Sequence, residues 1–368
     1  MLLVQSERNA LLASLSAVVG VVERRHTLPI LSNLLLERKA GALTVLATDL
    51  ELQVSTCIEG AEGGDDFAIT IAARKLFDIV RALPDGAQVK LDSKDSQVVV
   101  SAGKSRFTLQ TLPAADYPRV ETGAGLGEPV RLPQKTLKRL LQLVQFAMAS
   151  QDIRYYLNGM LLVLDGRALR VVATDGHRLS YAETELETEM AHREVILPRK
   201  TVIELSKLLA DSDDAVELRI GTNQVTIALP GTELVSKVVD GKFPDYQRVI
   251  PTSQPRTLQA RRQNVVQALQ RAAILSNEKF RGVRLVMSEN TLGIVCNNNE
   301  QEEAADEIEV SYSGDPLDVG FNVTYLLDGL NALSTDDITL SLGDANSSML
   351  LTSEGQAGFK YVVMPMRI

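Results

Sequence analysis

The chain has 368 residues, more than one hydrophobic core usually holds, so two or three domains of roughly 100 to 150 residues are expected. Its 45% apolar and 23% charged residues are typical of a globular protein, and no stretch approaches the ~20 apolar residues that cross a bilayer, which excludes a membrane protein. The net charge of −9, taken as an average, argues against nucleic acid as a partner.

Six segments carry apolar residues at helical spacing. In chain order they are 5–22, 72–83, 133–150, 198–210, 260–273 and 322–334. Alternating strand-like runs follow the second and the fourth of them, at 97–101 with 106–110 and at 224–229 with 234–239. Each half of a domain is therefore predicted to be a strand, a helix and three strands, which makes the fold class α+β.

The chain repeats itself with a period of about one domain. The segment 28–54 resembles the segment 155–182, and a weaker third copy covers 280–300. Thr48 and Thr174 hold the same place in the first two copies and are 126 residues apart. A period of this length indicates three similar domains.

Linkers divide the repeats. Proline-containing stretches at 112–120 and 241–251 match in register and close the first two repeats, and a glycine-rich and a polar stretch follow them. We therefore predict three domains, at residues 1–124, 125–252 and 253–368.

Charge is unevenly distributed between the helical segments and the rest of the chain. The six segments sum to +9, with 13 basic and four acidic residues, whereas the remaining chain sums to −18. If all the helices of a repeated fold lie on one side, their charges form one surface that holds phosphates without reading bases. The alternative is that the basic side chains form an ordinary solvated face.

The width of a helix sets the size of the hole that such a surface would enclose. Twelve helices from two chains, each about 10 Å wide, line a circle whose hole is about 28 Å across, which admits a B-form duplex with its water. The helices of one chain would leave too small a hole. The pattern therefore favours a two-chain ring around DNA.

Several segments resemble one known family, the bacterial DNA polymerase III β subunit or sliding clamp, over essentially the whole chain. They are RYYLNGM, ATDGHRL, FPDY, RAAILSNEKFRGVRL and YVVMPMR, which begin at residues 154, 173, 243, 271 and 361. The resemblance implies the DNA-clamp fold: three similar domains per chain and two chains head to tail, with helices inside and antiparallel sheets outside. It also implies a non-catalytic protein without cofactor that tethers the replicative polymerase to DNA.

The resemblance further implies residues that touch DNA without reading its sequence. They are Arg25, Arg74, Gln151, Tyr155 and Tyr156. Their guanidinium, amide and aromatic groups can contact the DNA backbone and exposed bases. The charge of the helical segments adds Arg199 and Lys200.

A partner-binding pocket is implied as well, an apolar groove with polar edges. Its residues would be Tyr156, Leu157, Thr174, Gly176, His177, Arg178, Leu179, Pro244, Val249, Tyr325, Ser348, Val362, Met364, Met366 and Arg367. Methionine side chains adapt to several ligands, which suits short linear motifs from the polymerase III catalytic subunit, the clamp loader, other polymerases and repair proteins.

For ring closure the resemblance implies an apolar helix in the third domain meeting an edge of the first. The residues are Ile274 and Leu275 on one side and Lys104, Arg106, Phe107 and Leu109 on the other, with Glu300, Glu302 and Glu303 facing the basic residues. Lys104 stands where the family has Arg, and the acidic glycine-rich loop at 61–66 matches no motif of the family.

An enzyme is not favoured. Gly103, Lys104 and Ser105 spell the end of a phosphate-binding loop, but Val98 stands where that loop needs glycine, so a hairpin turn is predicted there. Asp175, His177 and Ser180 lie within six positions and cannot easily converge as a catalytic triad.

The spacing of histidines and cysteines does not favour a metal site or a redox site either. His26 and His192 have no ligand at metal-site spacing, and Cys57 and Cys296 lie 239 positions apart without a partner motif. The cysteines predict free thiols in a reducing compartment, the cytoplasm. The remaining alternative function is a repeat scaffold that binds proteins without encircling DNA.

Overall fold

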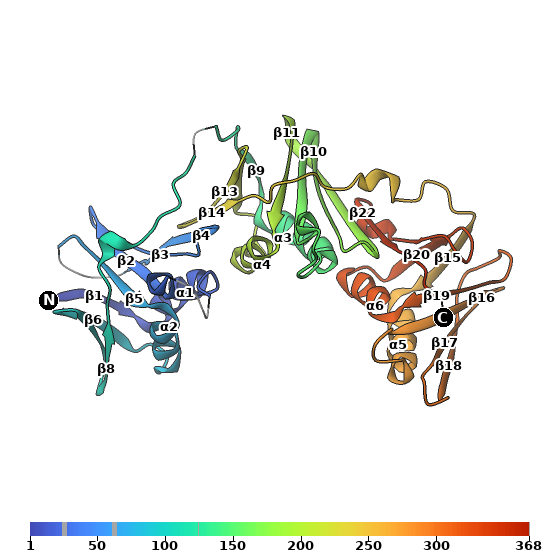
Figure 1. Ribbon diagram of the computed structural model, residues 1–368, viewed down its shortest axis with the longest axis horizontal. Coiled ribbons are helices and arrows are strands. Elements are labelled where there is room, and N and C mark those ends of the chain that lie inside the picture. Colours follow the sequence, from blue (N-terminus) through green and yellow to red (C-terminus); the bar gives the residue numbers. More distant parts are fainter. Residues whose placement is uncertain (24–27, 61–64, 124, 368) are drawn as a thin grey trace. The chain divides into compact units, whose positions relative to one another are not determined.

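The computed structural model describes residues 1–23, 28–60, 65–123 and 125–367 (Figure 1). The chain forms two compact units. The first contains Met1–Lys135 and Ile203–Val238, and the second contains Thr136–Val202 and Val239–Ile368.

Two antiparallel sheets build the first unit. The smaller has the order β1 (Leu2–Glu7), β6 (Gln88–Lys94), β7 (Gln97–Ala102) and β8 (Ser105–Gln110). The larger has the order β5 (Phe67–Ala72), β2 (Asn33–Lys39), β3 (Ala42–Thr48), β4 (Leu52–Cys57), β14 (Thr232–Lys237), β13 (Gln224–Leu229), β12 (Ala215–Ile220) and β9 (Val130–Pro133). Because β4 pairs with β14, one sheet continues across the predicted boundary at 124.

Helices α1 (Arg8–Val19) and α2 (Ala73–Ala82) lie side by side in this unit (Figure 1). Leu11, Leu15 and Val18 are buried along one face of α1, at the spacing that an amphipathic helix requires. Leu76 and Val80 do the same in α2, whose charged side chains stay exposed. Both helices therefore bury an apolar stripe, and α2 leaves its basic residues at the surface, whereas the Arg8 side chain of α1 is 14% exposed and bonds to Asp85.

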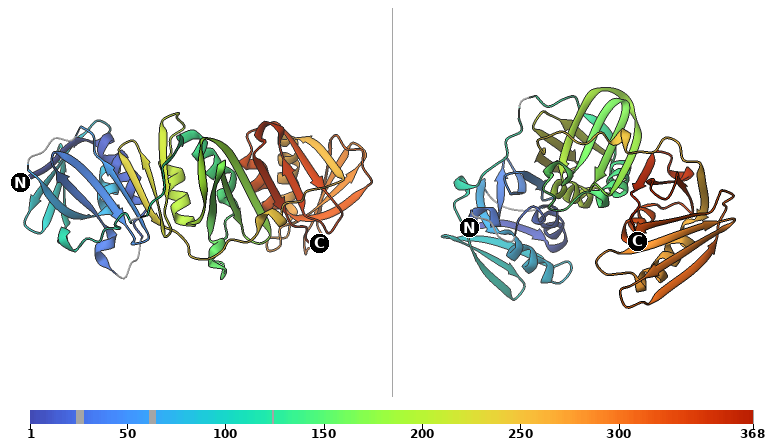
Figure 2. Two further views of the ribbon diagram at one scale, coloured as in Figure 1. Left: turned by 90° about the horizontal axis from the view of Figure 1, so that it is seen from above. Right: turned by 45° about the vertical axis from the view of Figure 1, so that its right-hand side comes forward.

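The second unit also has two antiparallel sheets. One has the order β10 (Gly159–Thr174), β11 (Arg178–Pro198), β22 (Phe359–Val363), β21 (Met349–Thr352), β20 (Asp337–Leu342) and β15 (Arg256–Arg261). The other, orange in Figure 2, has the order β18 (Glu303–Glu309), β17 (Thr291–Asn297), β16 (Gly282–Ser288) and β19 (Leu317–Asn322). The pairing of β11 with β22 crosses the predicted boundary at 252.

Four further helices complete the fold. They are α3 (Gln134–Val144), α4 (Arg199–Leu208), α5 (Arg262–Ala272) and α6 (Val323–Ala332). The side chain of Asn322 caps α6 by accepting hydrogen bonds from the backbone N–H groups of Thr324 and Tyr325. The element order follows the predicted strand, helix and three strands, with the long β10 and β11 replacing separate strands in the second repeat.

All six predicted helices are confirmed, with shifted ends. The predicted start at residue 5 was wrong, because Gln5 pairs with Lys90 in the β1–β6 ladder and α1 begins at Arg8. The predicted hairpin turn is confirmed: Gly103, with φ +56°, and Lys104 connect β7 and β8. Among the described residues, no helix is long and apolar enough to cross a membrane.

Candidate functional site

A pocket with a volume of about 180 Å³ opens in the second unit. The ends of β10, β11 and β22, the loop before β10 and the stretch after β14 contribute its walls. The lining residues are Arg154, Tyr156, Leu157, Thr174, Gly176, Arg178, Leu179, Phe243, Pro244, Tyr246, Val249, Val362 and Met364.

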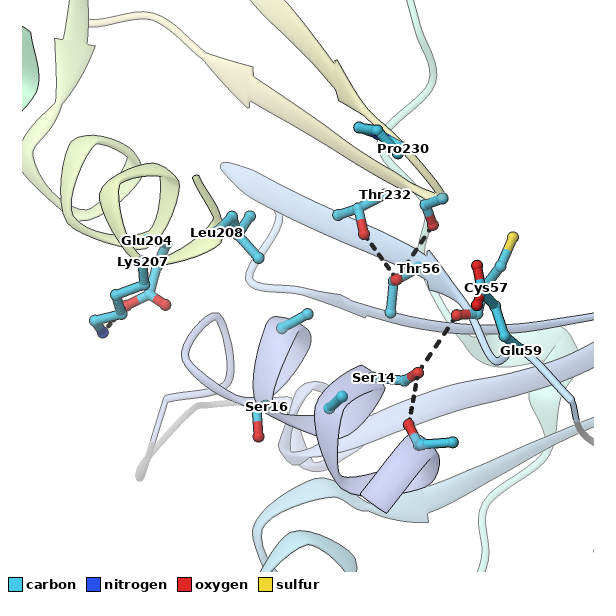
Figure 3. A pocket seen from close by; sticks show the side chains of 14 residues that line it. Ser14, Ser16, Thr56, Cys57, Glu59, Glu204, Lys207, Leu208, Pro230 and Thr232 are labelled. Atoms are coloured by element: carbon cyan, nitrogen blue, oxygen red, sulfur yellow. Dashed lines mark hydrogen bonds and ion pairs between the residues drawn. The ribbon is translucent and has the colours of Figure 1, made fainter. Parts of the chain in front are cut away.

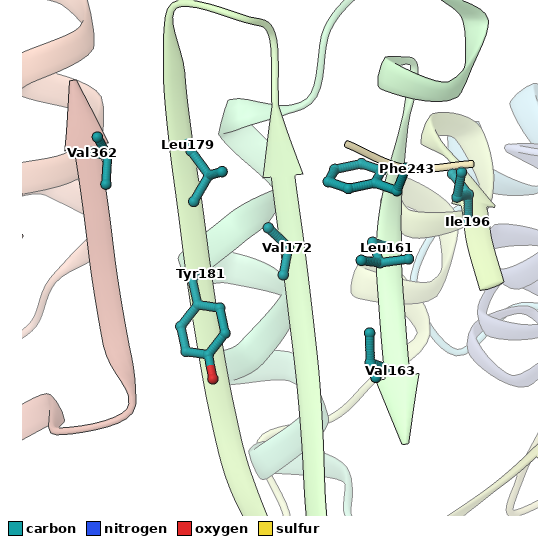
Figure 4. Packing of buried hydrophobic residues seen from close by; sticks show 8 residues of the cluster. All are labelled: Leu161, Val163, Val172, Leu179, Tyr181, Ile196, Phe243 and Val362. Carbon is teal, nitrogen blue, oxygen red and sulfur yellow. The ribbon is translucent and has the colours of Figure 1, made fainter. Parts of the chain in front are cut away.

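The floor of the pocket is formed by Leu179, Phe243 and Val362, which belong to a hydrophobic cluster on one face of the sheet (Figure 4). Leu179 and Val362, on neighbouring strands, are each 1% exposed, and Phe243 packs with them from outside the sheet. Strand alternation places every second residue of β10 and β11 on this face, which is why the cluster forms. An apolar floor in an open pocket favours a ligand with apolar side chains.

One wall is the turn between β10 and β11. The Thr174 hydroxyl donates to the backbone oxygen of Arg178 at 2.6 Å and accepts from the N–H of Gly176 at 3.1 Å. Asp175 Oδ1 accepts from the N–H groups of His177 and Arg178 at 2.9 and 3.1 Å. Gly176 has φ +89°, a conformation that favours glycine. The turn therefore has a defined shape even without a ligand.

The guanidinium of Arg178 connects this turn to two other elements. Its Nε donates to Asp175 Oδ2 at 3.1 Å, Nη1 to Asp328 Oδ2 at 2.6 Å and Nη2 to the backbone oxygen of Phe146 at 2.8 Å. The Tyr325 ring centroid lies 4.4 Å from its central carbon. Asp328 and Tyr325 belong to α6, and Phe146 follows α3.

The loop before β10 adjoins this turn, because Nη2 of Arg154 donates to the backbone oxygen of Asp175 at 3.3 Å. Asp152 accepts hydrogen bonds from Nε and Nη2 of Arg154 at 3.0 and 2.8 Å, and from the Arg154 N–H at 2.8 Å. These bonds lower the pKa of Asp152 to about 2, because they favour the charged carboxylate. Asn158 also ties the loop, since its side chain exchanges hydrogen bonds with the backbone of Asp152. The loop holds Tyr155 at the surface, 56% exposed.

The pocket brings together most of the residues that the family resemblance implied. His177 is exposed in the turn, Tyr325 packs under Arg178, and Met366 donates its N–H to Gly320, so these three do not line it. Half-buried Ser348 and exposed Arg367 are not among the lining residues either.

Sequence reasoning missed three lining residues, Arg154, Phe243 and Tyr246. A signal for them was present, because Arg154 opens the RYYLNGM motif, and Phe243 and Tyr246 flank Pro244 in the FPDY motif.

The first repeat has a smaller hydrophobic cluster of its own. Leu35, which stands 126 residues before Leu161 of the second-repeat cluster, packs against Tyr117, a side chain that is 5% exposed. The Tyr117 hydroxyl accepts from the N–H of Thr48 at 3.3 Å and donates to the backbone oxygen of Asn33 at 3.0 Å. Tyr117 and Tyr246 hold the same place in the matching stretches 112–120 and 241–251, but Tyr117 is buried whereas Tyr246 lines the pocket.

The residues expected to touch DNA lie in both units. Arg74 of α2 is exposed, and its Nη2 donates to the backbone oxygen of Val22 at 2.7 Å. It borders a surface groove of about 440 Å³ whose other residues are Val19, Phe77, Asp78 and Arg81. Arg25 lies outside the described residues.

The other residues of this group belong to the second unit. Gln151 is exposed with φ +60°, Tyr155 is exposed, and Tyr156 also lines the pocket. Arg199 donates to the backbone oxygen of Met148 at 3.0 Å, and Lys200 is half-buried.

Two sheet edges carry the residues expected at a dimer interface. At the edge strand β8, Lys104, Arg106 and Phe107 are exposed, whereas Leu109 is 9% exposed. At the edge strand β18 and just before it, Glu300, Glu302 and Glu303 are exposed. Beside β18, Ile274 is 77% exposed and Leu275 is half-buried. One edge is basic and the other acidic.

A larger cavity of about 620 Å³, which the sequence did not predict, lies in the first unit (Figure 3). The exposed thiol of Cys57 borders it, and two of the polar side chains drawn there bond to the chain itself: Ser14 to the oxygen of Cys57 at 3.3 Å, and Glu204 to Lys207 at 2.7 Å. Within the described residues, no group of three or more His, Cys, Asp or Glu is placed to hold a metal ion.

Comparison with known proteins gives a consistent result. Family profiles for the N-terminal, central and C-terminal domains of the DNA polymerase III beta subunit match residues 3–121, 131–245 and 247–367. The beta sliding clamp of Escherichia coli strain K12 is 46% identical over 362 residues, which cover 98% of this chain and 99% of that protein.

Two solved structures are similar over the whole chain. The sliding clamp of Pseudomonas aeruginosa bound to griselimycin has a TM-score of 0.93 and 44% identity, with 99% of both chains covered. The beta sliding clamp of Caulobacter crescentus, with polyethylene glycol bound to a putative beta-motif tethering region, has a TM-score of 0.94 and 38% identity, covering 100% of this chain and 99% of that one.

Proposed function

Since this chain belongs to the DNA polymerase III beta subunit family and is a sliding clamp, we propose that two copies close head to tail into a ring around duplex DNA. The observation that carries this proposal is the pair of open sheet edges with opposite charge, β8 and β18. An open edge presents unpaired backbone groups and is a template for pairing with another strand. A basic edge on one chain and an acidic edge on the next select the head-to-tail arrangement.

The interface has an apolar centre in this proposal. Phe107 on β8 is 37% exposed, and Ile274 next to β18 is 77% exposed. Burying large apolar side chains drives association, whereas the surrounding charges set its orientation. Lys104 and Arg106 would face Glu300, Glu302 and Glu303 at each of the two joints of the ring.

Within the ring, the basic helices face DNA in our proposal, and the sheets face outward. The helical segments sum to +9 and the rest of the chain to −18, so DNA is attracted only to the helix side. Contacts by Arg25, Arg74, Gln151, Tyr155, Tyr156, Arg199 and Lys200 would be to the sugar–phosphate backbone and exposed bases, which lets the ring slide. We propose three domains per chain with boundaries near 124 and 252, and the ranges of the three family profiles support this division.

The pocket is proposed as the docking site for short linear motifs of the polymerase III catalytic subunit, the clamp loader, other polymerases and repair proteins. Its apolar floor and its preformed turn support this role. The relative from Pseudomonas aeruginosa binds griselimycin, and the relative from Caulobacter crescentus binds polyethylene glycol at a putative beta-motif tethering region. We propose a cytoplasmic protein that acts by tethering, without catalysis or cofactor.

Light scattering at micromolar concentration tests the ring. The chain mass is 40.1 kDa, so the wild type is expected at about twice that value. Ile274→Asp places a charge in the apolar centre and is expected to return the mass to 40.1 kDa. Ile153→Asp is the matched control, because Ile153 is 96% exposed and lies outside both edges. A wild type with the mass of one chain would refute the dimer.

DNA topology then separates the ring from a scaffold that never encircles DNA. Once a clamp loader has placed the protein on a circular duplex, a ring stays bound until the circle is cut and then slides off the ends. A scaffold would dissociate at the same rate before and after cutting. Loading is expected to need a separate ATP-driven opener, and efficient loading onto closed circles without one would contradict a stable ring.

A further inference from the structure

We propose that Asp328 of α6 is a positioning residue for the pocket, acting through Arg178. Asp328 does not line the pocket. It holds the guanidinium of Arg178, and Arg178 in turn holds the Thr174–Arg178 turn that forms one wall. This inference rests on the proposed docking function of the pocket and adds a residue that sets its shape from α6.

The chain holds every nitrogen of the Arg178 guanidinium. Each of its three nitrogens donates a hydrogen bond to an internal acceptor, and the rings of Tyr325 and Phe146 lie 4.4 and 5.5 Å from its central carbon. A guanidinium held in this way is not free to make a bidentate contact with a ligand. Arg178 therefore contributes a fixed wall to the pocket.

Among the three acceptors, Asp328 is the one distant side chain. Asp175 lies three residues from Arg178 in the turn itself, and Phe146 offers a backbone oxygen that no substitution removes. Asp328 comes from 150 residues further along the chain. Its carboxylate therefore connects α6 to the pocket wall, and a substitution can remove this connection without changing the turn itself.

Burial strengthens this ion pair. The Arg178 side chain is 10% exposed and the Asp328 side chain 36%, so water screens the pair less than a surface pair. Without the carboxylate, the buried cation of Arg178 loses a compensating charge, and we expect it to move toward water. Thr174, Gly176 and Leu179, which line the pocket, sit in or beside the turn that would move with it.

Binding of griselimycin, measured by isothermal titration calorimetry on the full chain, tests the inference. Asp328→Asn is expected to weaken binding about tenfold, and Asp328→Glu is expected to recover part of the loss. Asp318→Asn is the matched control: its carboxylate pairs with Arg284 in the same unit, its side chain is 45% exposed, and it is not among the pocket residues. The control is expected to bind as the wild type does.

A double-mutant cycle separates positioning from a general loss of stability. If Asp328 acts through Arg178, then Asp328→Asn costs no further affinity in an Arg178→Gln background. Should Arg178→Gln not fold, Arg178→Lys serves in its place, because a lysine cannot donate to three acceptors in a plane. Additive losses of affinity in the cycle would overturn the inference.

One further variant tests the pocket itself. Val249→Lys puts a charged amine in the apolar wall, and Val286→Lys, half-buried on β16, is its control. If Val249→Lys leaves griselimycin binding intact, the assignment of the pocket fails. If Val249→Lys abolishes binding but Asp328→Asn binds like Asp318→Asn, only the role of Asp328 is refuted.

Discussion

The substitution Tyr117→Phe removes one buried hydroxyl. We expect it to lower the free energy of unfolding by an amount that depends on pH. The hydroxyl accepts from the N–H of Thr48 and donates to the oxygen of Asn33, so its loss leaves two buried backbone groups without that partner. At pH 8 this is expected to lower the free energy of unfolding by about 1–3 kcal/mol. Tyr155→Phe is the control and is expected to cost nothing measurable, because the Tyr155 ring is 56% exposed.

Burial raises the pKa of Tyr117 to about 12 from its ordinary value of 10.0, although the hydrogen bond from Thr48 opposes the rise. A raised pKa in the folded state means that this stabilisation is complete below pH 10 and is lost as the pH rises through 12. For these two pKa values the wild type loses about 1.4 kcal/mol by pH 11, which Tyr117→Phe does not lose.

Urea denaturation of both proteins at pH 8 and pH 11 measures this difference. The gap in unfolding free energy between wild type and Tyr117→Phe is expected to shrink by about 1.4 kcal/mol between the two pH values. A gap that stays constant would show that the folded protein does not favour the neutral hydroxyl of Tyr117, and would refute the reasoning.

Two further predictions concern charged side chains. The Asp152 carboxylate, with a pKa lowered to about 2 by Arg154, stabilises the loop before β10 above pH 4, and this contribution is lost as the pH falls through 2. Hydrogen exchange of residues 152–158 is therefore expected to quicken between pH 4 and 2 in the wild type, once intrinsic rates are subtracted, but not in Asp152→Asn. Arg38 is 6% exposed, and its Nε and Nη2 have no hydrogen-bond partner among the described residues. Arg38→Met removes this buried charge and is expected to raise the melting temperature by a few degrees, about 2–4 °C per kcal/mol, and a lower melting temperature would contradict this.

Local patterns in the sequence were sufficient to predict the six helices and one hairpin turn. The apolar spacing of Leu11, Leu15 and Val18 predicts α1, and the pair Gly103 and Lys104 predicts the hairpin turn. The predicted start of α1 was wrong because residues 2–8 contain no glycine or proline, so nothing in the local sequence marks the boundary between β1 and α1. The pairing of Gln5 with a strand some 80 residues away decided the outcome.

The sequence by itself determined the threefold repeat, the six helices, the separation of basic helices from an acidic remainder, and the family, because each is carried by periodicity or by short motifs. Only the tertiary structure decided that Arg178 reaches Asp328, 150 residues away, and that Tyr117 is buried in the first repeat whereas its counterpart Tyr246 lines the pocket in the second. The physical reason is that a buried polar or aromatic side chain takes its role from the neighbours that folding brings to it, and no spacing along the chain specifies those neighbours.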